Sequence, residues 1–156
     1  MTTQVWSPNA FPVGTYDPTR FQLVFPGLPN LEMFLNVISV PNVNLGMANH
    51  TTRLIDLKQP GEKLYFSVLE CSFIFDVKMN NYKELYNWMK RISVMGLHES
   101  DVQDARLITE IGVFVFQNVY PISLGGAVFD ATATDIQSPS CQVTFAYDLF
   151  YPEESL

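Results

Sequence analysis

Glu70 and Asp76 are the two carboxylates whose spacing comes nearest to that of a catalytic acid and base pair. They lie an even number of residues apart in an alternating stretch, so both side chains could face one cleft. The same spacing occurs on the solvent-exposed face of an ordinary half-buried strand. Exposed strand faces are far commoner than catalytic pairs, and we therefore predict a protein that is not an enzyme.

Metal and cofactor sites find no better support in the sequence. His50 and His98 fall in different predicted loops, and neither has a partner at the spacing of a zinc site. The Gly125–Gly126 pair lacks the lysine and the following helix that a phosphate-binding loop needs. We therefore expect no cofactor and no metal.

Cys71 and Cys141 are the two cysteines, and each lies in an alternating apolar run where it would point inward. Both are interpreted as small buried hydrophobic residues, although a bridge between them is possible in principle. Residues 1–20 lack the layout of a signal peptide, and no apolar run approaches the roughly 18 residues of a membrane span. We expect the chain to be made and to fold in a cytoplasm, with no membrane segment.

The composition is unusually poor in charge. Of the 156 residues, 47% are apolar and 16% are charged, against roughly 25% charged residues in an average soluble domain. One domain of this length can bury a sufficient core. Two interpretations remain open: a compact, aromatic-rich β protein, or a protein whose surface is largely covered by neighbouring subunits.

The net charge of −7 is unevenly distributed along the chain. Residues 1–91 carry seven acidic and eight basic residues, whereas residues 92–156 carry nine acidic residues and one base, Arg106. This asymmetry could favour head-to-tail contacts between copies, or it could simply keep the surface soluble. A surface that grips DNA phosphates is disfavoured, because such binding needs clustered lysine and arginine.

Alternation of apolar and polar residues predicts a domain built mostly of antiparallel β-strands. It is plainest in residues 64–77 and 141–151, where every second side chain is apolar. The polar side carries Glu70 and Asp76 in the first stretch and Asp148 in the second. Shorter strands are expected at residues 21–25, 31–40, 109–119 and 127–136.

One segment has helical rather than strand periodicity. Tyr82, Leu85, Tyr86, Met89 and Ile92 recur at the spacing of one helix face, with Trp88 beside them. Asn81 is a plausible N-cap, with Glu84 three residues on. The sequence thus predicts an α+β fold, mostly antiparallel β, with one main helix at about 81–93 whose aromatic stripe seals a sheet.

Two segments lack a regular period. Residues 1–20 carry three prolines among aromatic residues, which suits an extended N-terminal arm ahead of a single β domain at 21–156. Residues 41–63 are polar and aperiodic, apart from Leu54, Ile55 and Leu57, and are predicted to form a long loop. A loop of this length inside a compact domain is usually mobile or functional, and its apolar residues suggest that part of it pairs as a strand or packs on a partner.

Taken in order, these segments resemble the tail tube proteins of contractile-tailed bacteriophages. The resemblance covers about residues 20–151, and no single motif carries it alone. It rests on the following segments: Phe21-Gln22-Leu23, a strand ending at Pro41, the long polar loop, the strand from Leu69 to Asp76, the helix from Asn81 to Trp88, Asn118-Val119-Tyr120-Pro121, and the strand from Val143 to Asp148.

The resemblance implies two sheets packed across one another, in a sandwich or barrel, with the helix against them. It also implies a structural subunit that forms hexameric rings, which stack into a tube whose acidic lumen conducts DNA without binding its sequence. The implied partners are further copies of the chain, a tail sheath, and baseplate or neck proteins. The implied location is the tail of the virion, with assembly in the host cytoplasm.

Within that resemblance, the 41–63 loop corresponds to the contact with the adjacent ring. Its candidate contact residues are Arg53, Leu54, Ile55, Leu57 and Lys58. The polar strand faces are the candidates for the lumen, represented by three acidic residues: Glu70, Asp76 and Asp148. Two alternatives remain, namely a tube-initiating baseplate or neck-proximal subunit of the same fold, and a small β domain that binds an apolar ligand.

Overall fold

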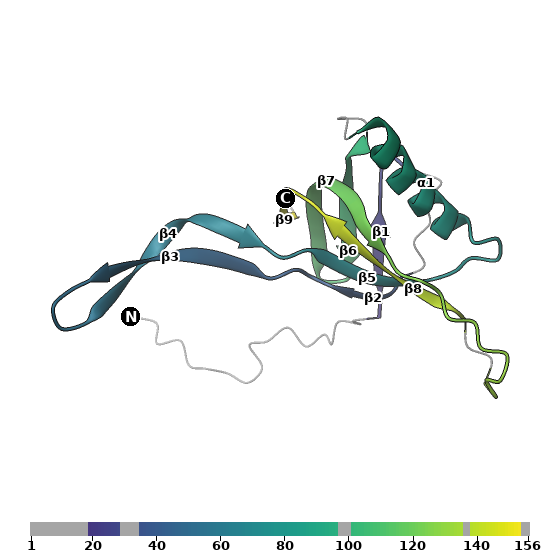
Figure 1. Ribbon diagram of the computed structural model, residues 1–156, viewed down its shortest axis with the longest axis horizontal. Helices are drawn as coiled ribbons and strands as arrows, with labels where there is room; N and C mark the ends of the chain where they lie inside the picture. Colours follow the sequence, from purple (N-terminus) through teal and green to yellow (C-terminus); the bar gives the residue numbers. More distant parts are fainter. Residues whose placement is uncertain (1–18, 29–34, 97–100, 136–137, 154–156) are drawn as a thin grey trace, which may run out of the picture.

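The computed structural model describes residues 19–28, 35–96, 101–135 and 138–153 (Figure 1). Over these residues the chain forms one helix and nine strands, and every strand pairing is antiparallel, so the predicted mostly antiparallel α+β fold is confirmed. The elements are β1 (Phe21–Val24), β2 (Leu35–Ser39), β3 (Val43–Thr51), β4 (Asp56–Phe66), β5 (Leu69–Ile74), α1 (Asn80–Met95), β6 (Gln103–Thr109), β7 (Gly112–Leu124), β8 (Ser140–Ala146) and β9 (Leu149–Glu153).

Strand β7 joins two sheets into one body. Its first part pairs with β6 and β9, and β1 completes this sheet beside β6. Its second part pairs with β8, followed by β5 and then β2, so the order is β7-β8-β5-β2 in the other sheet. In Figure 1 the strands of the two sheets cross at a steep angle. The predicted pair of packed sheets is therefore present.

The change of partner along β7 occurs at Asn118. This residue has a positive φ of 55°, in the left-handed region that asparagine tolerates better than most side chains. Its backbone N–H donates to Asp104 Oδ1 at 3.2 Å, and its side-chain amide donates to Asp148 Oδ2 at 2.6 Å. Both hydrogen bonds hold the corner at which the strand leaves one sheet for the other.

The core lies between the two sheets and under α1. Trp88 is 2% exposed, and its ring lies 5.7 Å from that of Phe25 and 6.3 Å from that of Phe145, centroid to centroid. Its indole N–H donates to the backbone oxygen of Asp101 at 2.6 Å, which ties the helix to the start of the β6 region. The helix therefore seals the sheets, as its periodicity predicts, although Tyr86 on the predicted stripe is exposed.

The helix begins one residue earlier than predicted, and its N-cap is Met79 rather than Asn81. Asn81 is buried, and its side-chain amide donates to the Ile74 carbonyl at 2.9 Å, so it anchors the helix to β5. Asp76 serves the helix start instead, since its Oδ1 accepts the Asn80 backbone N–H at 2.5 Å. The prediction failed because either side chain could satisfy a free N–H of the first turn.

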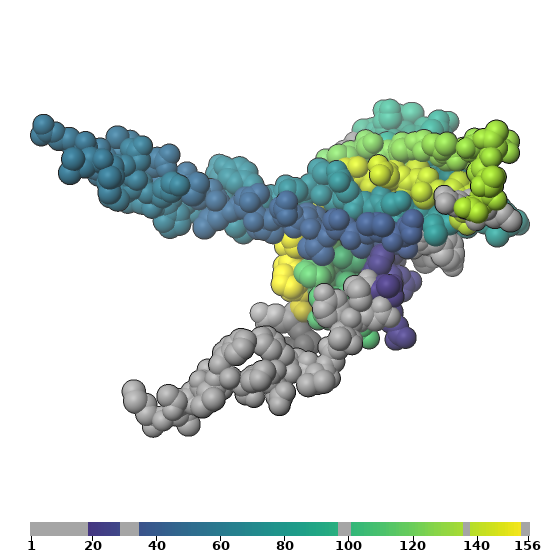
Figure 2. Space-filling model, turned by 90° about the horizontal axis from the view of Figure 1, so that it is seen from below, coloured from purple at the N-terminus to yellow at the C-terminus, as the bar shows by residue number. Residues whose placement is uncertain are grey.

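The predicted polar loop at 41–63 is instead most of a long β-hairpin. Among the described strands, β3 and β4 pair only with each other, and they project away from the body (Figures 1 and 2). The nine residues of β3 alone reach about 30 Å at about 3.3 Å per residue. At its base the hairpin continues the β2 and β5 pair, where the Ser67 N–H donates to the Asn42 carbonyl at 3.1 Å.

Three other strand predictions are corrected. The alternating stretches 64–77 and 141–151 each divide into two strands, because alternation persists while the chain changes its pairing partner. Within 127–136, the described residues 127–135 contain no strand. Conversely, β6 lies in a segment predicted to be a polar connection. The residues that form it alternate between buried and exposed: Ala105 and Leu107 are buried, whereas Asp104, Arg106 and Ile108 are exposed.

The N-terminal arm predicted at 1–20 lies outside the described residues except for its last two. Among the described residues, α1 is the one α-helix, and it lacks the length and the apolar character that a membrane-spanning helix needs.

Candidate assembly surfaces

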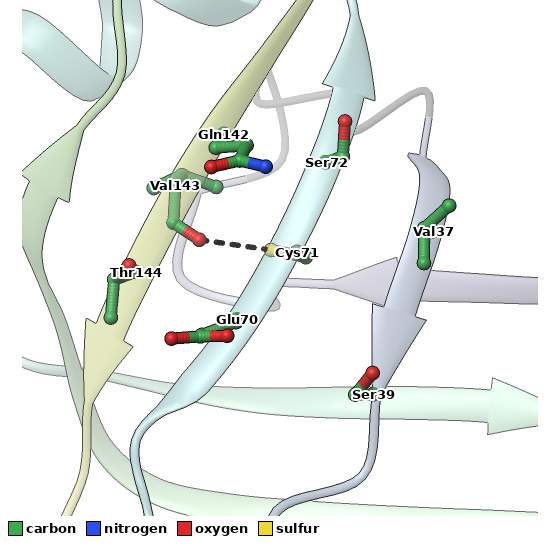
Figure 3. A pocket seen from close by; sticks show the side chains of 8 residues that line it. All are labelled: Val37, Ser39, Glu70, Cys71, Ser72, Gln142, Val143 and Thr144. Carbon is green, nitrogen blue, oxygen red and sulfur yellow. Dashed lines mark hydrogen bonds between the residues drawn. The ribbon is translucent and has the colours of Figure 1, made fainter.

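One surface of the body is a polar sheet face (Figure 3). It lies on the side of β2, β5 and β8 opposite the core, since the intervening residues Phe73 and Phe145 are buried. The strand register aligns its side chains in two rows, Ser39-Glu70-Thr144-Ser123 and Val37-Ser72-Gln142. Together with Cys71 and Val143, most of these residues line a shallow hollow of about 350 Å³.

Of the three acidic residues predicted to share polar strand faces, only Glu70 does so. It is the one charged side chain in the two rows, and it is exposed. Asp76 lies beyond the end of β5 and binds the start of α1. Asp148 lies in the turn between β8 and β9 and binds Asn118. The structure thus does not bring Glu70 and Asp76 together on one face, which removes the geometric basis for an acid and base pair.

The β3–β4 hairpin carries an exposed apolar stripe. Register and alternation place five residues near its base on one face, and all are exposed in the single chain: Val43, Leu45, Met47, Pro60 and Leu64. Farther out, the same face becomes polar with Asn49, Thr51, Asp56 and Lys58. The stripe meets the body at Phe66, whose ring lies 5.6 Å from Phe150. We call these five residues the hairpin stripe.

Two glycines allow the two strands of the hairpin to approach closely where their register shifts. A register shift falls between Leu45 and Met47, and here Gly61 lies directly against Gly46. A Cβ on Gly61 would come within 2.6 Å of the Gly46 carbonyl oxygen, closer than any real contact of this kind. The close approach therefore requires glycine at position 61.

The outer end of the hairpin, residues 52–58, is called the hairpin tip, and it bears all five predicted ring-contact residues. Leu54 and Ile55 are 91% and 61% exposed, and Arg53 is exposed beside them. Leu57 and Lys58 lie in the first residues of β4 and are exposed as well. The structure therefore gathers all five residues at the end of one projecting element, which the sequence described only as an aperiodic loop.

The outer side of α1 is a third surface. Lys83 and Lys90 are exposed there with Tyr86, and the helix lies alongside β7 with Met89 and Leu124 at their junction. A groove of about 440 Å³ is lined by Tyr82, Tyr86, Met89, Lys90, Ser93 and Leu124. The surface is basic and aromatic, in contrast to the acidic chain as a whole.

Both cysteines and one of the two histidines fall within the described residues. Cys71 and Cys141 are free and buried, as predicted, and burial raises the pKa of the Cys71 thiol to about 12. His50 is exposed on β3, and His98 lies outside the described residues. Among the residues with described positions, no group of histidine, cysteine and acidic side chains is arranged to hold a metal ion.

Two surface features were missed by the sequence predictions. The hairpin stripe alternates at Val43, Leu45 and Met47, which is a strand signal that the intervening asparagines obscured. The other is the β7–β8 loop, of which residues 125–135 and 138–139 are described. It exposes Val128 and Phe129, and adjacent apolar residues in a segment that lacks alternation could have identified it.

Comparison with known proteins shows similarity in structure only. No family model and no curated protein matches the sequence. A solved chain from the sheath and tube terminator of an extracellular contractile injection system, named PVC, superposes with a TM-score of 0.69 at 18% identity. The alignment covers 92% of this chain and 100% of that one.

Two further solved structures have the same fold. A chain from the tube-terminating cap of the anti-feeding prophage has a TM-score of 0.66 at 19% identity, covering 93% of both chains. A chain from the PVC sheath–tube complex has a TM-score of 0.61 at 18% identity, covering 94% of this chain and 95% of that one. The chain therefore has a tail-tube-like fold, while identities this low leave its role to be argued from its own surfaces.

Proposed function

We propose that the chain is a structural, non-enzymatic subunit of the inner tube of a contractile tail or contractile injection system. The observation that carries this proposal is the β3–β4 hairpin, which projects from the body with an exposed apolar stripe and an apolar tip. A two-stranded hairpin by itself is marginally stable in water. A neighbouring subunit that covers the stripe would supply the burial that the single chain does not.

In the proposed assembly, hexameric rings stack along a common axis and the polar sheet face lines the lumen. Support comes from the two rows of Ser, Thr, Gln and Glu70, which offer no basic side chain to DNA phosphates. Among the described strands, β2 pairs with β5 alone, which leaves its other edge open. Sheet edges of this kind are normally covered, and pairing with the next subunit in a ring would close it.

The basic outer side of α1 then faces away from the lumen and towards a sheath protein. It lies across the core from the polar sheet face, as Trp88 packing against Phe145 indicates. A tube-initiating baseplate subunit or a neck-proximal terminator would use the same surfaces. Because the chain is similar in structure to a chain of a tube-terminating cap, the proposal includes a subunit at either end of the tube.

The alternative of a small domain that binds an apolar ligand is less well supported. The region between the sheets is filled by aromatic and aliphatic side chains, including Trp88, Phe25, Phe73, Phe116 and Phe145. An apolar-ligand site requires a concave apolar cavity with a few converging polar groups. The hollow on the polar face is shallow and is lined mostly by polar residues, so it does not meet that description.

Purification of the full chain tests the proposal directly. Sedimentation should show rings in equilibrium with subunits, and electron micrographs should show rings or short tubes. Deletion of residues 49–57 should leave a folded body that forms no tubes, because it removes the hairpin tip. A matched control is Val94→Ser, which alters an exposed residue of α1 and should leave ring formation unchanged.

Two results would count against the proposal. A protein that sediments as a monomer at every concentration, with no rings in micrographs, would contradict the tube assignment itself. Tubes of normal length from the deletion variant would leave that assignment standing but would remove the hairpin as the element that stacks rings.

A further inference from the structure

The hairpin tip is a closed, preformed projection. The Thr52 backbone N–H donates to the Ile55 carbonyl oxygen at 3.0 Å, and the Ile55 N–H donates to the Thr52 hydroxyl oxygen at 3.2 Å. These hydrogen bonds close the turn and leave Leu54 almost fully exposed. A preformed tip loses little conformational entropy on binding.

The β7–β8 loop, elsewhere on the chain, carries exposed apolar side chains beside an acidic hollow. Val128 and Phe129 are 82% and 73% exposed, in a segment that is not paired to any strand. A hollow of about 540 Å³ lies here, and its described lining residues are Val128, Asp130, Ala133, Asp135, Ser138, Pro139 and Ser140. This volume is in the range of about 300–1,000 Å³ that is typical of sites enclosing a ligand.

Hydrogen bonds fix the acidic rim of that hollow. Asp130 Oδ1 accepts the Thr132 backbone N–H at 2.8 Å and the Thr132 hydroxyl at 2.6 Å. These bonds lower the pKa of the Asp130 carboxyl, which is therefore ionised at neutral pH. Asp135 adds a second carboxylate, and no lysine or arginine occurs between residues 125 and 140.

The tip and the hollow are complementary in charge and in surface character. Leu54 and Ile55 would be covered by Val128 and Phe129, while Arg53 and Lys58 would meet Asp130 and Asp135. Within one chain the two elements lie at opposite ends of the molecule's long axis (Figure 1) and cannot meet. Figure 2 shows the same separation from a second direction. The complementary surfaces therefore belong to different copies.

We propose that the hairpin tip of one copy docks head to tail in the β7–β8 hollow of a second copy of this chain. A contact between two different surfaces is heterologous and continues from copy to copy until it closes or forms a filament. This inference rests on the proposed tube function and identifies the partner surface of the hairpin within it.

Charge reversal on each side tests the docking. Two one-sided variants are made: Arg53→Asp with Lys58→Asp, and Asp130→Lys with Asp135→Lys. Each places like charges across the contact and should raise the protein concentration needed for tubes by about tenfold or more, which corresponds to about 1.4 kcal/mol. Combining all four substitutions in one chain restores opposite charges across the contact and should return assembly towards the original concentration. Tube formation is measured by sedimentation and electron microscopy.

The matched control reverses two other basic residues by the same amount. Lys78→Asp with Arg106→Asp changes the net charge as the tip variant does, but at two exposed positions outside the proposed contact surfaces, and should leave tube formation unchanged. Docking is refuted if either one-sided reversal assembles like the original chain, or if the four-residue variant assembles no better than the one-sided variants. If the original chain forms tubes in those cases, the tube function survives. If it forms neither rings nor tubes, both proposals fail.

Discussion

The body and the β3–β4 hairpin use the same alternation of side chains with opposite results. In the body, Leu69, Cys71 and Phe73 point into a core closed by Trp88. In the hairpin, Val43, Leu45 and Met47 alternate in the same way, yet all are exposed. The apolar face of the body is therefore covered by other parts of the same chain, whereas the hairpin stripe stays exposed in the part of the chain that the structure describes.

This difference indicates where stability and assembly reside. Burial of apolar area contributes roughly 25 cal/mol per Å², so the body supplies the folding free energy of the single chain. The hairpin contributes little until another surface covers it. Substitutions should accordingly divide into those that unfold the subunit and those that only impair its association.

The largest effect on folding is expected at Trp88. Trp88→Ala should lower the free energy of unfolding by about 3–5 kcal/mol, because it empties the centre of the core and removes the hydrogen bond to Asp101. Tyr86→Ala on the exposed side of the same helix is the control, with a change within about 0.5 kcal/mol. Urea unfolding followed by circular dichroism measures both. Equal effects at the two positions would mean that α1 does not seal the core.

The next effect is a pH dependence that originates at Cys71. Burial raises the pKa of its thiol from 9.0 to about 12, so the folded chain keeps a proton that the unfolded chain releases above about pH 9. The stability from this group is complete below pH 9 and is lost as the pH rises towards 12. At pH 10 the loss should be on the order of 1 kcal/mol.

Cys71→Ala isolates this contribution from other groups that titrate in base. The variant should be less stable at neutral pH, yet its stability should fall less steeply between pH 9 and pH 11 than that of the original chain. Parallel pH profiles for the two proteins would show that the thiol is not the group responsible.

The sequence predicted the body better than the hairpin, for a physical reason. The alternation of apolar and polar residues indicates which face of a sheet each side chain lies on. The pattern is strong where one face is buried in a core, as at Leu69 and Phe73. It does not report which strand lies alongside. The ends of β4 and β8 were missed for this reason, because the apolar and polar pattern continues through the residues where pairing changes.

The candidate surfaces were predicted in part for the same reason. The tip residues Leu54 and Ile55 were identified because apolar residues in a polar segment are conspicuous, and Glu70 because its face is regular. Asp76 and Asp148 continue the same periodicity but fall in turns, where their carboxylates bind a backbone N–H and a side-chain amide. Hydrogen bonds between residues distant in sequence, such as Asn118 to Asp148, leave no periodic signal.

A smaller effect is expected at Asp76, which lies in the body although it was predicted to share a face with Glu70. Asp76→Ala removes the acceptor of the Asn80 N–H and should cost about 1 kcal/mol of folding free energy. Glu84→Ala, at an exposed position of the same helix, is the control and should change stability by less than about 0.5 kcal/mol. If Asp76→Ala leaves urea unfolding unchanged, the carboxylate is not needed at the helix start.

The smallest effect on folding is expected at Met47 in the hairpin stripe. Met47→Ser should change the unfolding free energy of the isolated subunit by less than about 0.5 kcal/mol, because this side chain is 69% exposed and has no core to leave. In the assembled state the same substitution should weaken association, since a covered methionine loses favourable contacts when it is replaced by serine. Folding and assembly would thus respond differently to one residue.

Hydrogen exchange tests whether the hairpin depends on a partner or is stable by itself and simply tolerates substitution. Backbone amides of β3 and β4 should exchange much faster than those of β5 and β8 in the isolated subunit, because the hairpin can open without disturbing the core. On assembly, the hairpin amides should slow while those of β5 change little. If they exchange as slowly as β5 before assembly, the hairpin is stable alone, and the exposed stripe at Met47 no longer requires a partner.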